Sequence, residues 1–188
     1  MAVDTEFLRM VYWPAGLAYK LEPAERYRLL RCNVDTLHPV RLGLMLFDAR
    51  CVLPGGHDGA TRLGRTGVVM SRGGYDLTYL VKMMFGTGFG MPGSATEFDA
   101  VVKAVLHRWR VFGVGEMARL CPREHLRRGL DSVAGQLNEA RFAANAARQA
   151  SYDSLWTCYT FMKLREIYFD DDGKLAGVDG ILAEVTTF

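Results

Sequence analysis

The sequence predicts an α/β protein in which a mixed central sheet is covered by helices on both sides. Short apolar segments that alternate like strands come first, and segments with helical spacing then alternate with further short strands. The chain has 188 residues, of which 49% are hydrophobic, and this length favours one domain with its own buried core. We therefore expect residues 1–188 to form a single domain.

The composition excludes several classes of protein. Lysine and arginine number 23 against 21 aspartate and glutamate residues, so the net charge of +2 is too small for a histone-like protein. No apolar run approaches the roughly 18 residues that a membrane span needs. The first residues do not resemble a signal peptide, and the four cysteines are widely spaced. We expect a protein of a reducing, intracellular compartment that does not bind a membrane.

Four segments have the composition of β-strands. The N-terminal segment Val3–Tyr12 is rich in β-forming residues. In Val40–Phe47 every even-numbered position is apolar, which predicts a strand with a buried face. Shorter strands are predicted at Val68–Met70 and Val111–Val114.

Helical spacing is clearest in the segments that follow these strands. Ser94 and Glu97 form a capping box at the start of an amphipathic helix, because each side chain can satisfy a free backbone N–H. Helices are also predicted at Ala24–Val34 and Tyr75–Phe85. Ser151–Tyr168 is apolar around most of its circumference, which is typical of a helix in the middle of a domain.

Two acidic residues of the first predicted strand suggest a metal site. Asp4 and Glu6 are two positions apart, so their carboxylates project from the same face of the strand. Neighbouring carboxylates repel each other unless a cation or a proton joins them, and magnesium or manganese prefers such oxygen ligands. Taken alone, however, a pair of this kind is more often a solvated pair.

Two further acids strengthen the metal hypothesis. Asp76 and Asp153 each stand where an apolar helix begins, a position from which a side chain can reach a shared cleft. A simpler interpretation is that each carboxylate only stabilises a helix N-terminus, by about 0.3–1 kcal/mol. Four acids at such positions would suit a two-metal site that hydrolyses a phosphodiester, in which the ions lie about 3.5–4 Å apart. Spacing alone leaves this the less favoured alternative.

Five motifs occur in a specific order along the chain and together resemble a known family. They look like the Caf/Pop-type deadenylase of plants, a member of the DEDD exonuclease superfamily and the nuclease subunit of the Ccr–Not complex. That enzyme shortens the poly(A) tails of mRNA. The resemblance runs from the first residues to about Leu182. The motifs are Val3–Phe7 (VDTEF), Tyr27–Asp35 (YRLLRCNVD), Gly74–Leu80 (GYDLTYL), Asp153–Thr157 (DSLWT) and Phe161–Phe169 (FMKLREIYF).

The resemblance implies a fold and an activity. The fold would be a ribonuclease-H-like three-layer α/β/α arrangement. The activity would be magnesium-dependent, 3′-to-5′ removal of adenylates from poly(A) RNA with two magnesium ions, or with manganese in their place. The residues that match the family's four metal-binding and catalytic acids are Asp4, Glu6, Asp76 and Asp153.

The chain departs from the family pattern at the general base. The family has a histidine five residues before its last aspartate, whereas this sequence has Arg148 there. An arginine stays protonated and cannot accept a proton from water. Losing a general base typically slows a reaction by about 10²–10⁴-fold, so we expect weakened activity. Arg148 could instead bind a substrate phosphate, and Arg72, near Asp76, is a second candidate for that role.

The central part of the chain is also shorter than the resemblance implies. Between Leu53 and Val68 the family has a longer block, here reduced to a glycine-rich loop, and the family's N-terminal extension is absent. We therefore expect the sheet to have one edge strand fewer than the family's sheet.

Two hypotheses about function follow. The first is an RNA exonuclease that acts in mRNA decay, bound to the Ccr–Not scaffold together with a second deadenylase subunit. The second is a catalytically impaired relative that serves as a binding module for that scaffold or for poly(A). We expect no binding to DNA and a location in the cytoplasm, with the nucleus as a second location.

Overall fold

The computed structural model describes residues 1–16, 21–47, 67–86, 88–107, 109–122 and 150–182. Two features discussed above, Arg148 and nearly all of the shortened central block, lie outside these residues. Among the described helices, none has the length and hydrophobicity that crossing a membrane requires.

The described strands form one mixed sheet, as the sequence predicts. Its order is β2-β1-β3-β4, and β2 is antiparallel to β1 whereas β3 and β4 are parallel to it. Within the described part of the sheet β2 is therefore an edge strand. The bounds of the strands are Ala2–Phe7 (β1), Pro39–Met45 (β2), Gly67–Met70 (β3) and Arg110–Gly113 (β4).

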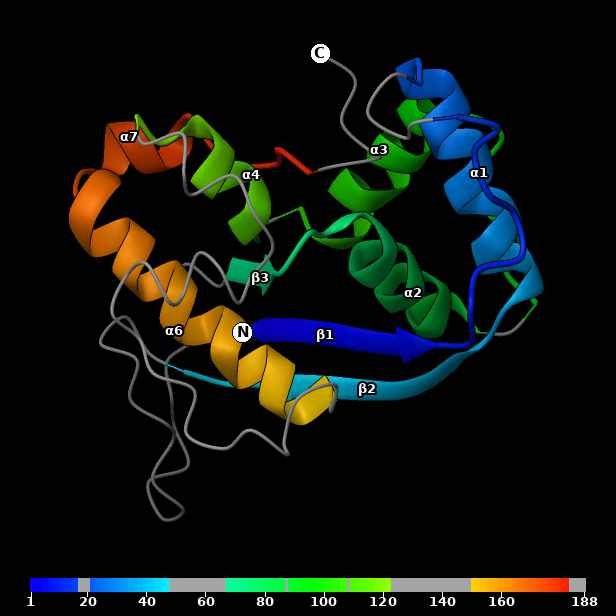
Figure 1. The fold of residues 1–188 in the computed structure, drawn as a ribbon, viewed down its shortest axis with the longest axis horizontal. Coiled ribbons are helices and arrows are strands. Elements are labelled where there is room, and N and C mark those ends of the chain that lie inside the picture. The colour runs from blue at the N-terminus through cyan, green and yellow to red at the C-terminus, as the bar shows by residue number, and fades with distance from the viewer. Residues whose placement is uncertain (17–20, 48–66, 87, 108, 123–149, 183–188) are drawn as a thin grey trace.

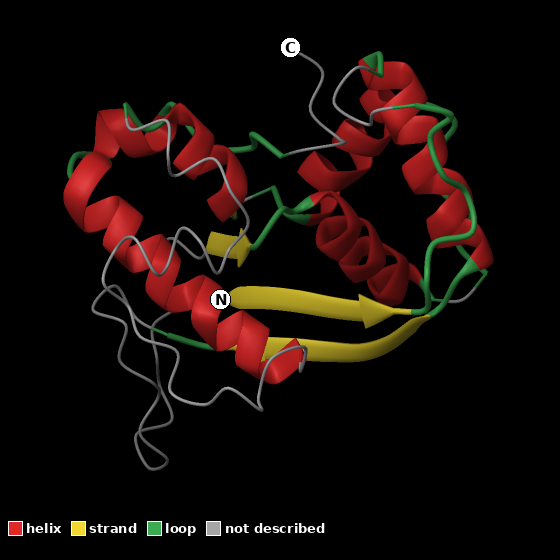
Figure 2. Cartoon of the chain, in the orientation of Figure 1, coloured by secondary structure: helices red, strands yellow, loops and turns green. Residues whose placement is uncertain are grey.

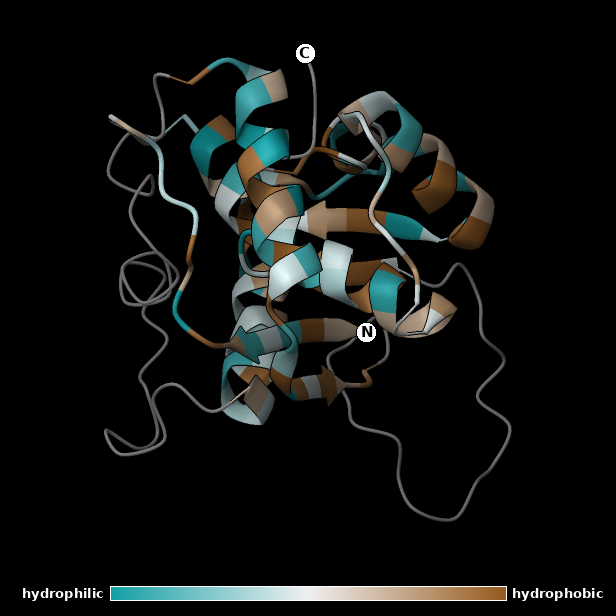
Figure 3. Ribbon diagram, turned by 90° about the vertical axis from the view of Figure 1, so that its right-hand side faces the viewer, coloured by the Kyte–Doolittle hydropathy of each residue, from teal (hydrophilic) through white to brown (hydrophobic). Residues whose placement is uncertain are grey.

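Helices cover both faces of the sheet, so the predicted three-layer arrangement is confirmed (Figures 1 and 2). One face, which includes Val3, packs against α1 (Pro23–Thr36), α2 (Gly74–Phe85) and α3 (Ala95–Val105). The opposite face, which includes Ala2, packs against α4 (Val114–Leu120), α6 (Ala150–Tyr168) and α7 (Asp172–Ala176). The brown, apolar strand residues accordingly lie between helices of mixed colour in Figure 3.

The predicted capping box is formed at the start of α3. The Ser94 hydroxyl accepts a hydrogen bond from the Glu97 backbone N–H at 3.2 Å. The Glu97 carboxylate reaches back one residue further than the usual motif and accepts from the Gly93 N–H at 2.8 Å. The first strand, by contrast, ends at Phe7 and not at Tyr12. The residues after Phe7 leave the sheet and run toward α1, where they have other hydrogen-bond partners.

Strand β2 has a buried face, as the alternation predicts, but that face is not the one that carries the apolar row. Its strand conformation is confirmed, but Val40, Leu42, Leu44 and Leu46 are 61%, 40%, 50% and 56% exposed. The covered face is the other one, where Gly43 is buried against the first residues of α6. Alternation shows that two faces differ, but at a sheet edge it does not decide which of them a helix will cover.

Candidate metal and substrate site

Strand β1 presents Asp4 and Glu6 on one face of the sheet. Ala2 belongs to the core on the side of α6, and side chains alternate along a strand, so Asp4 and Glu6 project toward the same layer. Both residues are half-buried at the end of this strand. Thr5, between them, points to the opposite face.

Asp76 is fixed by β1 although it belongs to α2. It lies in the first turn of that helix, is buried, and accepts two hydrogen bonds from Thr5, one from the backbone N–H at 2.9 Å and one from the hydroxyl at 2.7 Å. Burial raises the pKa of Asp76 to about 6, and the hydrogen bonds from Thr5 oppose that rise. These bonds tie the N-terminus of α2 to the strand that carries the other two acids.

Asp4 lies within electrostatic range of the other three acids. Its pKa is raised to about 8, first by burial and then by the negative charges of Asp76, Asp153 and Glu6. Asp153 comes from the first turn of α6 and is half-buried. The fold therefore brings the other three acids that the sequence indicated within electrostatic range of Asp4. Their role as metal ligands stays a prediction.

The donor set fits hard divalent cations. Within the described part of the chain, no three acidic, histidine or cysteine side chains already stand as a preformed metal group. Glu6 shows what a cation would add, because its Oε1 is buried without a hydrogen-bond partner while Oε2 pairs with Arg41 at 3.3 Å. Carboxylates that repel each other and lack hydrogen-bond donors are stabilised by a cation that prefers oxygen ligands.

Gly43 lets α6 lie close enough to the sheet for Asp153 to come near Asp4. It pairs with Asp4 across β1 and β2. A methyl group added at Gly43 would overlap the carbonyl of Ala150 and lie 2.6 Å from the backbone nitrogen of Ser151. Only a glycine fits under the first turn of this helix. A glycine inside a predicted strand is a signal for such close approach, and the sequence analysis did not use it.

A cavity of about 690 Å³ opens beside the acids, which is within the usual range for a ligand site. Asp4 and Asp76 lie at this cavity, and Arg72, predicted to bind phosphate, also lines it and is exposed. Its other walls are mainly aromatic and apolar, with one further arginine. They include Phe7, Met10, Tyr12, Trp13, Arg26 and Tyr75.

Asn33 of α1 holds the wall of this cavity in place. The side-chain oxygen of this fully buried residue accepts from the backbone N–H groups of Val11 and Tyr12, both at 2.9 Å. Its amide nitrogen donates to the carbonyl oxygens of Tyr12 and Leu29 at 2.9 and 3.0 Å. Sequence analysis assigned no role to Asn33 or to Trp13.

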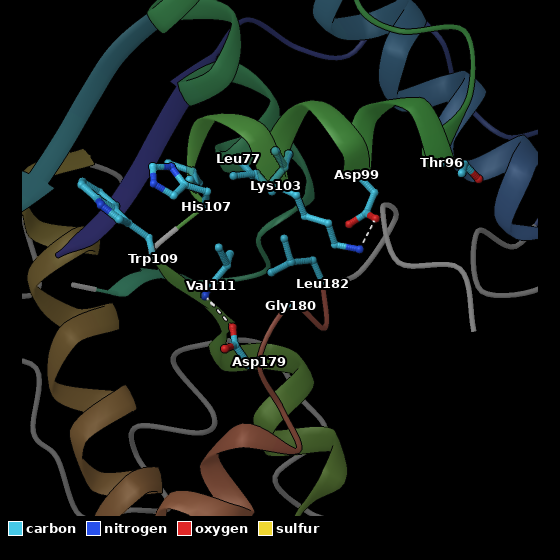
Figure 4. A pocket seen from close by; sticks show the side chains of 12 residues that line it. Leu77, Thr96, Asp99, Lys103, His107, Trp109, Val111, Asp179, Gly180 and Leu182 are labelled. Carbon is cyan, nitrogen blue, oxygen red and sulfur yellow. Dashed lines mark hydrogen bonds and ion pairs between the residues drawn. The ribbon is translucent and has the colours of Figure 1, made fainter. Parts of the chain in front are cut away.

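A second cavity, of about 490 Å³, lies away from the acids, between α3 and residues 179–182 (Figure 4). Its two carboxylates are already engaged: Asp99 pairs with Lys103 at 2.5 Å, and Asp179 pairs with Arg110 at 3.1 Å. Asp179 also accepts from the backbone N–H of Val111 at 2.8 Å. This cavity therefore offers no spare carboxylate for a metal ion.

Comparison with known proteins identifies similar chains of one kind. No family model matches the chain. It is 25% identical over 238 residues to the probable CCR4-associated factor 1 homolog 7 of Arabidopsis thaliana. The aligned region covers 97% of this chain and 82% of that protein. It is 36% identical over 101 residues to the probable CCR4-associated factor 1 homolog 5 of the same plant, covering 54% of this chain and 34% of that protein.

Two solved structures have the same fold. The S. pombe Pop2p structure, a Mg²⁺- and Mn²⁺-bound form, matches with a TM-score of 0.73 and 22% identity, covering 97% of this chain and 89% of Pop2p. A chain in the structure of the yeast NOT1 MIF4G domain co-crystallized with CAF1 matches with a TM-score of 0.64 and 15% identity, covering 96% and 85%. The ribonuclease-H-like fold is thus confirmed, and so is the resemblance inferred from the five motifs.

Proposed function

We propose that this chain, which resembles CCR4-associated factor 1 proteins over nearly its whole length, is a 3′-to-5′ exoribonuclease that shortens poly(A) tails. The observation that carries the proposal is the gathering of Asp76, Asp153 and Glu6 around Asp4 beside an open cavity. The arginines of that cavity suit phosphate, and the carboxylates suit cations.

In the proposed mechanism, Asp4, Glu6, Asp76 and Asp153 hold two magnesium ions, or manganese ions in their place. When bound, the ions supply water activation and neutralise charge that develops on the phosphodiester. Thr5 keeps Asp76 oriented through two hydrogen bonds, and Gly43 sets the position of the helix that carries Asp153. Arg72 binds a phosphate oxygen at the cavity wall. The Mg²⁺ and Mn²⁺ in the Pop2p structure support this choice of metals.

We propose that catalysis is slower than in relatives that have a histidine general base, because Arg148 occupies that position in the sequence. The variant Arg148→His should then raise the rate of nucleotide release at saturating RNA, by about 10-fold or more. An unchanged or lower rate would point to phosphate binding by Arg148. Lys at this position, which keeps the charge, is the matched control.

The proposed partners are poly(A) RNA, the Ccr–Not scaffold and a second deadenylase subunit. The similarity to a chain from the NOT1 and CAF1 structure supports the scaffold as a partner. We place the protein in the cytoplasm, with the nucleus as a second location.

Release of adenylates from a 5′-labelled RNA with a 20-adenylate tail tests the proposal. We expect a ladder of products that shorten from the 3′ end with magnesium and not with EDTA. Asp153→Ala and Asp76→Asn should each abolish the ladder. Asp99→Asn is the matched control, because this exposed acid lies at the second cavity. Binding of RNA or scaffold without any metal-dependent product would favour the binding-module hypothesis, which the arginine at position 148 supports.

A further inference from the structure

The cavity beside the acids has a feature that metal binding does not require. Its lining includes Met10, Tyr12 and Trp13, of which Tyr12 and Trp13 are 43% and 54% exposed. Exposed aromatic side chains on a loop are commonly mobile, but here the backbone is held by the buried amide of Asn33. The protein thus orders an exposed aromatic segment at the same cavity that Asp4 and Asp76 line.

The orientation of the Trp13 ring is fixed as well. Its indole N–H donates to the carbonyl oxygen of Met10 at 3.0 Å, and this bond spans only three residues. Since the single polar group of the ring is engaged, the contact that remains available is through its faces. Aromatic faces of this kind stack with nucleobases, and the interaction is tolerant of sequence because every base has such a face.

Arg26 supplies a cation to the same cavity. It lies in the first turn of α1, is half-buried, and has no ion-pair partner among the described residues. Its Nε is buried without a hydrogen-bond acceptor. A guanidinium without an acidic partner, beside exposed aromatic rings, is the combination that single-stranded nucleic acids bind, because a phosphate oxygen can accept from it.

We propose that Trp13 stacks on a nucleobase of single-stranded RNA bound in this cavity and that Arg26 contacts a phosphate of the same strand. The proposal deepens the proposed function and rests on it for the identity of the ligand. Asp4 and Asp76 face the same cavity and repel phosphate, so the strand reaches them only when cations are bound. Trp13 and Arg26 bind the part of the strand that is not being cleaved.

Fluorescence anisotropy with a labelled oligoadenylate octamer, in magnesium, tests the proposal. All proteins carry Asp153→Ala, so that the RNA stays intact. We expect Trp13→Ala to weaken binding by about 5- to 100-fold. Trp13→Phe keeps an aromatic ring that can stack, so its affinity should lie within about threefold of that of the parent. Trp109→Ala, at the second cavity and 38% exposed, is the control and should not change binding.

Octamers in which one base at a time is replaced by an abasic residue identify the stacked position. At one position, removal of the base should weaken binding to the parent protein. At that same position it should not weaken binding to Trp13→Ala any further, compared with the intact octamer. Arg26→Gln should weaken binding of every octamer and reduce its dependence on salt. The proposal is overturned if Trp13→Ala binds like the parent, if Trp13→Phe is as weak as Trp13→Ala, or if the parent binds no RNA.

These outcomes are separate from those that test the proposed function. Binding that depends on Trp13, without metal-dependent cleavage by the unsubstituted protein, would support the stacking surface and contradict the nuclease. Cleavage by the unsubstituted protein, with Trp13→Ala unaffected in binding, would contradict the stacking surface alone.

Discussion

Replacing Gly43 by alanine should damage the acid site without touching an acid. The added methyl would overlap the Ala150 carbonyl, and the atoms it meets are backbone atoms that cannot rotate away. To bring the distance between the added methyl and the Ser151 nitrogen to an ordinary contact, α6 must move outward by about 0.8 Å. The Ala150 carbonyl is closer to the methyl, so it requires a larger displacement. Asp153 lies two residues after Ser151 and must move with the helix.

The size of the effect follows from this displacement. Overpacking of a tight contact costs about 1–3 kcal/mol, and we expect the upper end because no flexible side chain can absorb the change. For a chain of this length, about 3 kcal/mol corresponds to a fall in Tm of about 6–12 °C. A misplacement of about 1 Å in a catalytic group costs on the order of 100-fold in rate. Gly43→Ala should therefore lose far more activity than its stability explains.

Thermal unfolding and the adenylate-release assay, both performed well below the lowered Tm, measure the two effects. Gly90→Ala is the matched control, because nothing lies within 4 Å of a methyl group added there. If Gly43→Ala unfolds and cleaves like the parent, the close approach of α6 to β2 is not what positions Asp153. If both variants lose activity equally, the loss is not specific to this contact.

Three further predictions concern the metal-free protein. Asp4→Asn should raise the free energy of unfolding in EDTA at pH 7 by about 1–3 kcal/mol, because a carboxyl group whose pKa is raised to about 8 must take up a proton when the chain folds, and an asparagine need not. Asn33→Ala should lower it by about 2–3 kcal/mol, because the bonds to residues 11 and 12 are lost, and it should increase proteolysis in the 10–13 segment. Burial raises the pKa of Cys121 to about 11. Between pH 9 and pH 11 this thiol therefore stays protonated in the folded protein, whereas it ionises in the unfolded chain. The free energy of unfolding should therefore fall as pH rises from 9 to 11, and burial of the Tyr27 hydroxyl, which also raises its pKa, acts in the same direction.

Each of these predictions has a control or an outcome that checks it. Chemical denaturation of Asp4→Asn at pH 7 in EDTA must show a higher midpoint, and an unchanged midpoint would mean that burial and the neighbouring carboxylates do not raise the pKa of Asp4. For Asn33, the aspartate variant is the control, since it keeps the acceptor for Val11 and Tyr12 but replaces the donor amide. For the alkaline prediction, Cys121→Ala should show a smaller loss between pH 9 and pH 11, and an identical loss would exclude the thiol as a source.

Most of the fold and the positions of the four acids could be predicted from the sequence. Alternation and helical spacing identify elements because burial imposes those periods locally. Asp76 and Asp153 were candidates because each stands where an apolar helix begins, and Asp4 because it shares a strand face with Glu6. The family resemblance joined these acids into one site, and the structure brings the other three within electrostatic range of Asp4.

What the sequence could not provide depends on contacts between distant segments. Thr5 gives no sign that it binds Asp76, because the two residues are 71 positions apart and meet only after the sheet forms. Asn33 likewise resembles any polar residue of a helix until residues 10–13 lie against it. Alternation likewise predicts that β2 has a buried face but not which one, because the side on which α6 lies is decided at Gly43 and not by the apolar row.

Residues 10–13 are attached mainly through the side-chain amide of Asn33 on α1, apart from the four acids, and this gives the molecule two parts that can change separately. The carboxylates are anchored by strand β1 and by the first turns of α2 and α6, whereas residues 10–13 are held mainly by α1, with one contact to Tyr75 of α2. If the proposed function holds, substitutions at Tyr12 or Trp13 will change how tightly RNA is bound while the four acids keep their positions. Ligand preference in this protein can evolve, or be engineered, by exchanging four residues.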